Sequence, residues 1–178
     1  HRFIEAGDWI VLQMTGQERR SSCNAGYKAI WDRREGYPSP DFFAALNPKL
    51  RDVVKEKLSE DIYPVGSRAG GLTSLMAKRT GLEEGTSVAV GIIDAHAAVP
   101  GATVTDPGKM VLIMGTSTCH MLLSPKQKFI KGIPGVVEDG ILPGFFGYEA
   151  GQAAVGDSFN WYVSNCVPGS YEQEARKK

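Results

Sequence analysis

Three segments of this sequence place polar side chains directly after or between apolar runs, where they could bind a ligand. The first contains Asp94, which follows the apolar run of residues 87–93. Ligands of open α/β sheets bind at the carboxyl ends of the strands, so an acidic residue at this position is a candidate site residue. Asp also commonly caps the helix that follows a strand, and residues 95–99 could begin one, so both interpretations stay open.

The second segment, Gly115-Thr116-Ser117, lies between two apolar runs. A turn that contains glycine leaves backbone N–H groups free to contact phosphate oxygens, and the two hydroxyl groups could assist. The segment has no Gly-Lys-Ser/Thr sequence and no helix is expected after it, so it is not a Walker loop. From these three residues alone, an ordinary polar turn is the simpler interpretation.

The third segment contains Glu149, which follows an aromatic run as Asp94 follows an aliphatic one. Two such carboxylates could converge on one ligand, although Glu149 could equally place negative charge at the start of the next helix. Lys28 lies on a helix that otherwise packs, where it could donate hydrogen bonds to a polar ligand. An exposed ion pair with Asp32, four residues later, is the alternative interpretation of Lys28.

Two other chemistries match the sequence less well. Asp94, His96, Cys119 and His120 could be assembled into a metal site, but their spacing does not match a known ligand motif, so no metal ligand is predicted. No serine lies in a Gly-x-Ser-x-Gly sequence, which argues against a serine hydrolase.

The composition narrows the function classes. The chain has 178 residues, 42% of them hydrophobic, and 20 Lys and Arg residues balance 20 Asp and Glu residues. Because no basic stripe is present to neutralise phosphates, a nucleic-acid partner is not expected. The apolar runs are far too short to span a bilayer, so no membrane partner is expected either. A protein that binds small molecules is the remaining expectation.

The cysteines and the first residue bear on the cellular context. Cys23, Cys119 and Cys166 lie far apart, without a Cys-x-x-Cys pair, and their number is odd. This usage favours neither a disulfide framework nor a thiolate zinc site and predicts a cytoplasmic location. The chain begins with His1 instead of Met and lacks a signal-peptide pattern, which suggests an excised fragment.

Hydrophobic periodicity and turn signals predict the elements that hold the candidate residues. Helices are expected at residues 3–14, 24–34, 41–46, 48–58, 72–79, 152–164 and 171–178, and strands at residues 62–65, 87–93, 110–114, 119–123 and 144–148. The strands on either side of residues 115–118 are expected to form a β-hairpin. The continuous apolar run of residues 87–93 predicts a strand that is covered on both faces, as in a parallel or mixed sheet.

The expected packing can be stated for two helices and one boundary. The helix at residues 24–34 should pack through Tyr27, Ile30 and Trp31. The helix at residues 152–164 should bury an apolar stripe consisting of Val155, Phe159, Tyr162 and Val163. The composition becomes richer in glycine and strand formers after Pro100, which predicts a domain junction near residues 97–104.

The order of several motifs resembles the FGGY carbohydrate kinases. These motifs are Pro64-Val65-Gly66, Gly70-Gly71-Leu72-Thr73, Thr80-Gly81-Leu82, residues 85–94 and Gly115-Thr116-Ser117. Residues 22–31, 94–97 and 148–152 are in addition similar to the family members that phosphorylate L-ribulose. The resemblance covers nearly the whole chain, and the order is much more specific than any single motif.

The resemblance implies an α/β, actin-like ATPase fold with a ribonuclease-H-like core, of which this chain holds parts of two domains around a cleft. Residues 1–100 would be the C-terminal part of the first, sugar-binding domain. Residues 101–178 would be the N-terminal part of the second, nucleotide-binding domain. The implied ligands are ATP, Mg²⁺ and a small-molecule sugar, and the resemblance is compatible with a homo-oligomer.

The resemblance also implies roles for the candidate residues. Asp94 matches the family's catalytic base and contacts the sugar, while Lys28 and Glu149 match positions that bind a ketopentose. Gly115, Thr116 and Ser117 match a turn that binds the nucleotide phosphates. The implied reaction is phosphorylation of L-ribulose to L-ribulose 5-phosphate in L-arabinose catabolism. A kinase for D-xylulose or another polyol, or a non-catalytic actin-like interaction module, is the alternative.

Two family motifs have no counterpart in this chain, namely the early Asp-Phe-Gly-Thr-type turn and the late Gly-Gly-Gly-Ala-type adenosine segment. The Mg²⁺ ligands and the adenosine pocket are therefore not expected here, and the isolated chain should have little or no kinase turnover. The implied mechanism needs the Asp94 carboxylate to face the same cleft as the turn at Thr116.

Overall fold

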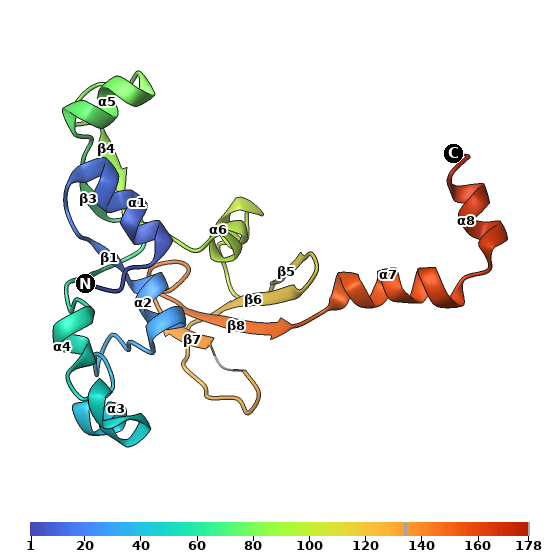
Figure 1. Ribbon diagram of the computed structural model, residues 1–178, viewed down its shortest axis with the longest axis horizontal. Coiled ribbons are helices and arrows are strands. Elements are labelled where there is room, and N and C mark those ends of the chain that lie inside the picture. Colours follow the sequence, from blue (N-terminus) through green and yellow to red (C-terminus); the bar gives the residue numbers. More distant parts are fainter. Residues whose placement is uncertain (134, 178) are drawn as a thin grey trace.

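The computed structural model describes residues 1–133 and 135–177, which form a mixture of helices and short strands (Figure 1). The helices are α1 (Ala6–Thr15), α2 (Ser22–Ala29), α3 (Pro40–Leu46), a 3-10 turn η1 (Pro48–Leu50), α4 (Val53–Lys57), α5 (Ser74–Thr80), α6 (Asp94–Gly101), α7 (Val155–Cys166) and α8 (Gly169–Ala175). The strands are β1 (Arg20–Ser21), β2 (Ile62–Tyr63), β3 (Arg68–Gly71), β4 (Ser87–Ala89), β5 (Met110–Met114), β6 (Thr118–Ser124), β7 (Gly135–Glu138) and β8 (Phe146–Gln152). None of the described helices is long and apolar enough to cross a membrane.

The largest sheet has four antiparallel strands in the order β5-β6-β8-β7. Strands β5 and β6 form the predicted hairpin around residues 115–117, with Met114 paired to Thr118. Helix α6 packs on β5 and β6 through a core cluster of Val99, Met121, Leu123 and Ile141. The hairpin prediction is therefore confirmed, and α6 covers one face of the sheet.

Helix α2 covers the same face of this sheet. Met121 is paired with Glu149, and Leu123 with Gly147, so these side-chain positions share one face. Tyr27 of α2 donates a hydrogen bond from its hydroxyl to the Gly147 carbonyl oxygen over 2.8 Å. We call this surface the α2–α6 face. It brings together two helices that are separated in the chain by the 64 residues 30–93.

Two small sheets form the rest of the strand structure. β1 pairs in parallel with β2, and β3 pairs with β4 in antiparallel orientation. Helix α1 packs beside β3 and β4 through Val11, which forms a buried cluster with Ala69 and Val90. These elements and the short helices α3–α5 lie on one side of the molecule, away from α7 and α8 (Figure 1).

The prediction of a buried strand over residues 87–93 is wrong in extent and in environment. Strand β4 ends at Ala89, has only β3 as a neighbour, and exposes Ser87 and Ala89. The Val90 N–H still donates to the Ser67 carbonyl oxygen over 2.8 Å, but Gly91 leaves the sheet and packs against the backbone of Gly7. The apolar run therefore serves as a connection between a two-stranded sheet and α6.

The helix predicted at residues 24–34 is shorter and starts earlier. Ile30 adopts a left-handed conformation with φ of 58°, and the Trp31 N–H donates to the Ala25 carbonyl oxygen over 3.1 Å. This bond closes the end of α2, as in helices that terminate in a left-handed residue. As a result Ile30 is exposed instead of packed, and Tyr27 provides the contact with the sheet.

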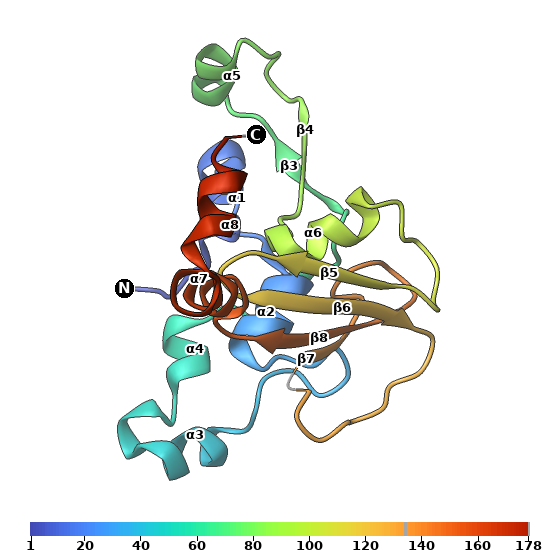
Figure 2. The same cartoon turned by 90° about the vertical axis from the view of Figure 1, so that its right-hand side faces the viewer.

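Helix α7 forms where the periodicity predicts it, but it buries none of its side chains. Phe159 is 69% exposed and Trp161 is 62% exposed. Figure 1 shows α7 and α8 extending away from the four-stranded sheet, and Figure 2 looks nearly along the axis of α7. The predicted burial of Val155, Phe159, Tyr162 and Val163 is therefore wrong for this chain, because no other described segment packs along the helix.

Candidate functional site

The predicted sugar-contacting side chains come from α2, α6 and β8, and a buried histidine of α6 lies beside them. The Ser21 hydroxyl accepts a hydrogen bond from the Cys23 N–H over 3.2 Å and thereby caps α2. The buried Cys23 thiol is hydrogen-bonded to the backbone of Ile93, the residue before Asp94. The start of α2 is thus joined directly to the start of α6.

Glu149 lies in the middle of β8 and points into the α2–α6 face. Its Oε2 atom is 3.5 Å from Nε2 of His96. The approach of the His96 ring lowers the pKa of Glu149 against the effect of burial, and the charge of Lys28 lowers the pKa further. The alternative that Glu149 begins the following helix is wrong, since β8 continues to Gln152 and α7 starts at Val155.

Lys28 is an exposed residue in the last turn of α2. The alternative ion pair with Asp32 is not formed, because α2 ends at Ala29 and the Asp32 carboxylate accepts hydrogen bonds from the backbone N–H groups of Arg34 and Glu35. The charge of Lys28 acts on Glu149 instead. The structure therefore brings these two predicted sugar-contacting residues into electrostatic range.

Asp94 is the first residue of α6 and its side chain is exposed. Ile93 occupies the N-cap position, and no side chain caps the helix. The next residue, Ala95, packs against the same buried cluster as Ile113 and Cys119 do. Ile113 and Cys119 form a cross-strand pair in the β5–β6 hairpin. Asp94 thus starts the helix that packs on β5 and β6.

The turn at Gly115, Thr116 and Ser117 is exposed and is held by α7. The Gly115 N–H donates to the Ser117 carbonyl oxygen over 2.8 Å, and the Gly156 N–H donates to the carbonyl oxygens of Gly115 and Thr116 over 3.2 and 3.1 Å. A Cβ on Gly156 would lie 2.6 Å from the Gly115 oxygen, so only glycine fits this approach. Among the described residues, the N–H groups of Thr116 and Ser117 have no hydrogen-bond acceptor. Such donors suit an anion.

The alternative metal site is not formed. In the part of the chain that the structure describes, no three His, Cys, Asp or Glu side chains are close enough to hold a metal ion. His96 meets Glu149 on the α2–α6 face, whereas His120 precedes Met121 in β6 and so lies on the opposite face of the sheet.

His96 and Tyr27 are the side chains that the sequence analysis did not connect with the sugar site. Their ring centroids are 4.1 Å apart, with an angle of 49° between the ring planes. His96 is 1% exposed, and its Nδ1 atom has no hydrogen-bond partner among the described residues. The sequence contained a signal for a role of His96 at the site, because His96 follows Asp94 by two residues. The same spacing also fits a metal ligand.

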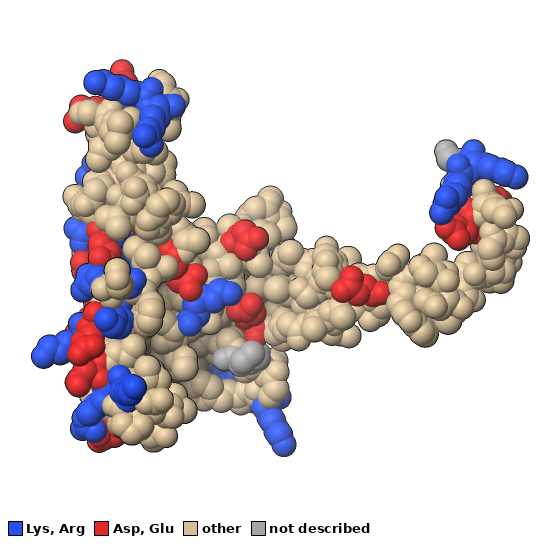
Figure 3. Space-filling view, in the orientation of Figure 1, with Lys and Arg blue, Asp and Glu red and all other residues tan. Residues whose placement is uncertain are grey.

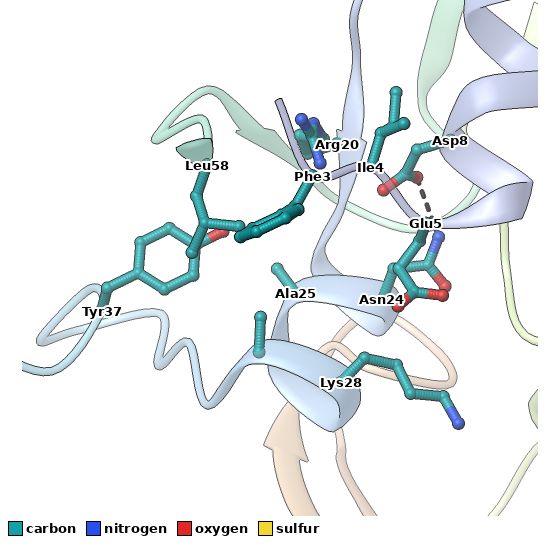
Figure 4. Close-up of a pocket in the computed structure, with 11 residues that line it drawn as sticks. Phe3, Ile4, Glu5, Asp8, Arg20, Asn24, Ala25, Lys28, Tyr37 and Leu58 are labelled. Carbon is teal, nitrogen blue, oxygen red and sulfur yellow. Dashed lines mark hydrogen bonds between the residues drawn. The ribbon is translucent and has the colours of Figure 1, made fainter. Parts of the chain in front are cut away.

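The best-defined cavity lies on the other side of α2. It has a volume of about 240 Å³ and extends between α1, α2, Tyr37 in the loop before α3 and Leu58 after α4. Figure 4 shows Asp8 and Asn24 at its polar end and the side chains of Phe3, Tyr37 and Leu58 gathered at its apolar end. Lys28 lines this cavity, but Asp94 and Glu149 do not.

The buried carboxyl group of this cavity is already bonded within the protein. Burial raises the pKa of Asp8, although Asp8 accepts hydrogen bonds from Asn24 Nδ2 over 2.8 Å and from the Ser21 N–H over 3.1 Å. Since the Ser21 backbone begins α2, these contacts join α1 to α2. The polar end of the cavity therefore has a structural role: it fixes the position of α2, the helix that carries Lys28.

Comparison with known sequences adds a family relationship. Residues 110–178 match the model of the FGGY family of carbohydrate kinases, C-terminal domain. The chain is 59% identical over 172 residues to the ribulokinase of Bacillus licheniformis, covering 97% of this chain and 31% of that protein. It is 43% identical over 175 residues to the ribulokinase of Staphylococcus aureus strain Newman, covering 98% of this chain and 32% of that protein. The chain thus spans about a third of the length of these relatives.

Comparison with solved structures agrees on the fold. The xylulose kinase of Rhodospirillum rubrum superimposes with a TM-score of 0.77 at 23% identity, over 96% of this chain and 33% of that one. The glycerol kinase of Plasmodium falciparum with ADP superimposes with a TM-score of 0.66 at 15% identity, over 91% of this chain and 32% of that one. The predicted α/β, actin-like fold is confirmed, and the chain holds part of it.

Proposed function

Because the chain belongs to the FGGY family of carbohydrate kinases, we propose that the whole protein transfers the γ-phosphoryl group of ATP to L-ribulose, giving L-ribulose 5-phosphate. The observation that carries this proposal is the 59% identity with a ribulokinase over 97% of the chain, which includes every candidate residue. The structural likeness to a xylulose kinase, at 23% identity, supports the fold only. The proposed sugar therefore rests on the more similar ribulokinase sequences.

Lys28 and Glu149 would bind the ketopentose in this reaction. The ammonium group of Lys28 donates to sugar hydroxyl oxygens, and the Glu149 carboxylate accepts from sugar hydroxyl groups. The lowered pKa of Glu149 keeps this carboxylate ionised at neutral pH. Hydrogen bonds to a charged partner are stronger than neutral ones, so the pair would fix the orientation of the sugar.

Asp94 would act as the general base. A carboxylate beside the substrate hydroxyl accepts its proton as the oxygen attacks the γ-phosphorus, while positioning and charge stabilisation supply most of the acceleration. Two observations support this role. Asp94 is exposed and makes no capping bond. Ala95 beside it packs against the same buried cluster as Ile113 and Cys119, which belong to the two strands that the turn connects.

Gly115, Thr116 and Ser117 would hold the phosphates of ATP. The unpaired N–H groups of Thr116 and Ser117 and their exposed hydroxyl groups form a donor set that fits phosphate oxygens. Mg²⁺ bound to ATP would neutralise charge on the phosphates during transfer. No residue of this chain is assigned as a metal ligand.

The same proposal divides the chain between two domains and places the reaction in the cytoplasm, where ATP is available. Residues 1–100 belong to the sugar-binding domain and residues 101–178 to the nucleotide-binding domain. The 178-residue chain alone would have no measurable turnover, because it lacks the family's early phosphate turn and adenosine segment.

A panel of substrates tests the proposed function. The whole protein is assayed for ADP release with ATP, Mg²⁺ and either L-ribulose, D-xylulose or glycerol. We expect kcat/KM to be highest for L-ribulose, by at least about tenfold, because a site built from hydrogen-bonding groups discriminates strongly between sugars. Equal values for glycerol and L-ribulose would refute the assigned substrate. No ADP release with any of the three would favour the non-catalytic interaction module.

A further inference from the structure

His96 is a buried polar side chain whose contacts are incomplete. It is 1% exposed, and neither ring nitrogen has a partner at ordinary hydrogen-bond distance among the described residues. Buried polar groups in proteins are nearly always bonded, so this side chain calls for an explanation. The group closest to a partner is Nε2, which lies 3.5 Å from Oε2 of Glu149.

The surroundings of His96 restrict its ring to one orientation. The Tyr27 ring lies against the His96 ring in a tilted arrangement with the centroids 4.1 Å apart, and the Tyr27 hydroxyl is itself fixed by the 2.8 Å hydrogen bond to the Gly147 carbonyl oxygen. Val99, three residues after His96 in α6, is fully buried in the core of the sheet. The imidazole is therefore held between a fixed ring and a fixed helix, with Nε2 toward Glu149.

The glycines of β7 and β8 make this arrangement possible. A Cβ on Gly135 would lie 3.0 Å from Cδ1 of Tyr27 and 3.0 Å from the Cβ of Glu149. A Cβ on Gly147 would collide with the Tyr27 hydroxyl and lie 2.7 Å from Cγ1 of Ile141. The absence of side chains at these two positions gives Tyr27 the space from which it supports His96.

We propose that His96 is a positioning residue of the sugar site, whose Nε2–H group holds the Glu149 carboxylate so that its second oxygen is presented to a substrate hydroxyl. This inference rests on the proposed function, in which Glu149 binds the ketopentose. A carboxylate with one oxygen fixed loses less freedom when the sugar binds, so the contribution of His96 appears in sugar affinity. Tyr27 acts through His96 by fixing the plane of its ring.

A pair of amide substitutions tests the geometry of this contact. In the whole protein, the His96→Gln side chain places an amide nitrogen near the position of Nε2, whereas the shorter His96→Asn side chain places it near Nδ1. We expect His96→Asn to raise KM for L-ribulose by roughly 10- to 100-fold, as for the loss of a hydrogen bond to a charged group. We expect His96→Gln to stay within about threefold of the unchanged protein. Equal KM values for the two variants would overturn the proposal.

The distribution of the effect separates positioning from loss of structure. We expect kcat and KM for ATP to change by less than about threefold in His96→Asn, because the substitution alters neither the proposed base Asp94 nor the proposed phosphate-binding turn at residues 115–117. The matched control is His120→Asn, a histidine on the opposite face of the same sheet, for which both KM values should stay unchanged. A general fall in kcat with unfolding at lower temperature would instead assign His96 a purely structural role.

A double substitution tests whether His96 acts through Glu149. If it does, His96→Asn should have an effect on KM of less than about twofold when Glu149→Gln is already present. If the fold increases in KM of the two single variants multiply in the double variant, the two residues act independently, and the inference is contradicted.

A spectroscopic measurement distinguishes failure of this inference from failure of the proposed function. In whole protein labelled with ¹⁵N-histidine and without substrate, the Nε2 signal of His96 should shift when Glu149→Gln is introduced. An active ribulose kinase whose His96 signal does not shift would refute the positioning role alone. A shifted signal in a protein that phosphorylates no sugar would refute the proposed function while keeping the contact.

Discussion

Helices α6 and α7 are similar in sequence pattern and opposite in environment. Each follows a strand and has an aspartate in its first turn, Asp94 in α6 and Asp157 in α7. Yet α6 buries His96 and Val99 against the four-stranded sheet, whereas α7 buries no side chain. The difference shows that local sequence determines where a helix forms, and that the partner surface determines what the helix can do chemically.

The two helices also differ in the charge around them. Figure 3 shows Lys, Arg, Asp and Glu side chains gathered over the part of the molecule that holds α1–α5, and a largely uncharged surface along α7. Asp157 is the one charged residue in the α7 sequence. On the α2–α6 face, by contrast, the opposite charges of Lys28 and Glu149 act on one another beside a buried imidazole. Pairs of identical residues from the two regions therefore provide direct tests of the contrast.

The largest expected difference concerns the two aspartates. In the whole protein, Asp94→Asn should lower kcat by about 10²- to 10⁴-fold, the range for loss of a general base. Asp157→Asn should change kcat by less than about twofold, since it removes an equivalent exposed charge from the first turn of α7. The measurement is ADP release at saturating ATP and L-ribulose. Similar losses in both variants would mean that Asp94 contributes only helix-dipole stabilisation.

The second difference concerns the cysteines. Burial raises the pKa of the Cys23 thiol from 9.0 to about 12, whereas Cys166 at the end of α7 is exposed. Below pH 9, Cys23 should therefore hold about 1,000-fold less thiolate than a thiol of ordinary pKa, and thiolate is the form that reacts. Timed alkylation with iodoacetamide at pH 8, read by peptide mass, should label Cys166 first and leave Cys23 unlabelled until the chain is unfolded. Early labelling of Cys23 would show that α2 separates readily from α6.

The third difference concerns two glycines. Gly147→Ala should destabilise the chain by about 1–3 kcal/mol, because the added methyl group collides with Tyr27 and Ile141. Gly169→Ala, at the first residue of α8, should be neutral or slightly stabilising, since no atom lies within 4 Å and alanine favours helix formation. Urea unfolding followed by circular dichroism measures both. Equal stability of the two variants would contradict the close packing of Tyr27 against β8.

Sequence reasoning predicted the local elements around the candidate residues more successfully than the packing of those elements. The hairpin around Gly115–Ser117 followed from two apolar runs and a glycine, which is local information. The position of Glu149 was predicted at the end of a strand and is in the middle of one, because strand length depends on the partners β6 and β7. The contact of His96 with Glu149 joins residues 53 positions apart, and no local pattern encodes that distance.

Burial was the property that the sequence predicted least well. The apolar run at residues 87–93 and the apolar stripe of α7 both indicated burial. The described chain places β3 and α1 beside the first, but Ser87 and Ala89 stay exposed, and α7 buries no side chain. Hydrophobic periodicity identifies the side chains that favour burial, but the energy gained depends on the surface that meets them. An apolar residue in α7 should therefore contribute little to the stability of this chain.

Two valines, one in each helix, provide the most direct test of this difference in burial, and the expected effect is the smallest of those described. Val99 in α6 is 0% exposed and Val163 in α7 is 49% exposed, so one substitution can be made in two helices of the same chain. Val99→Ala should lower the free energy of unfolding by roughly 2 kcal/mol, since two buried carbon atoms are lost and a cavity remains. Val163→Ala should change it by less than about 0.5 kcal/mol and in the stabilising direction, because alanine has the higher helix propensity and little burial is lost. A loss at Val163 as large as at Val99 would mean that α7 is covered in solution, and the contrast between the two helices would then not hold.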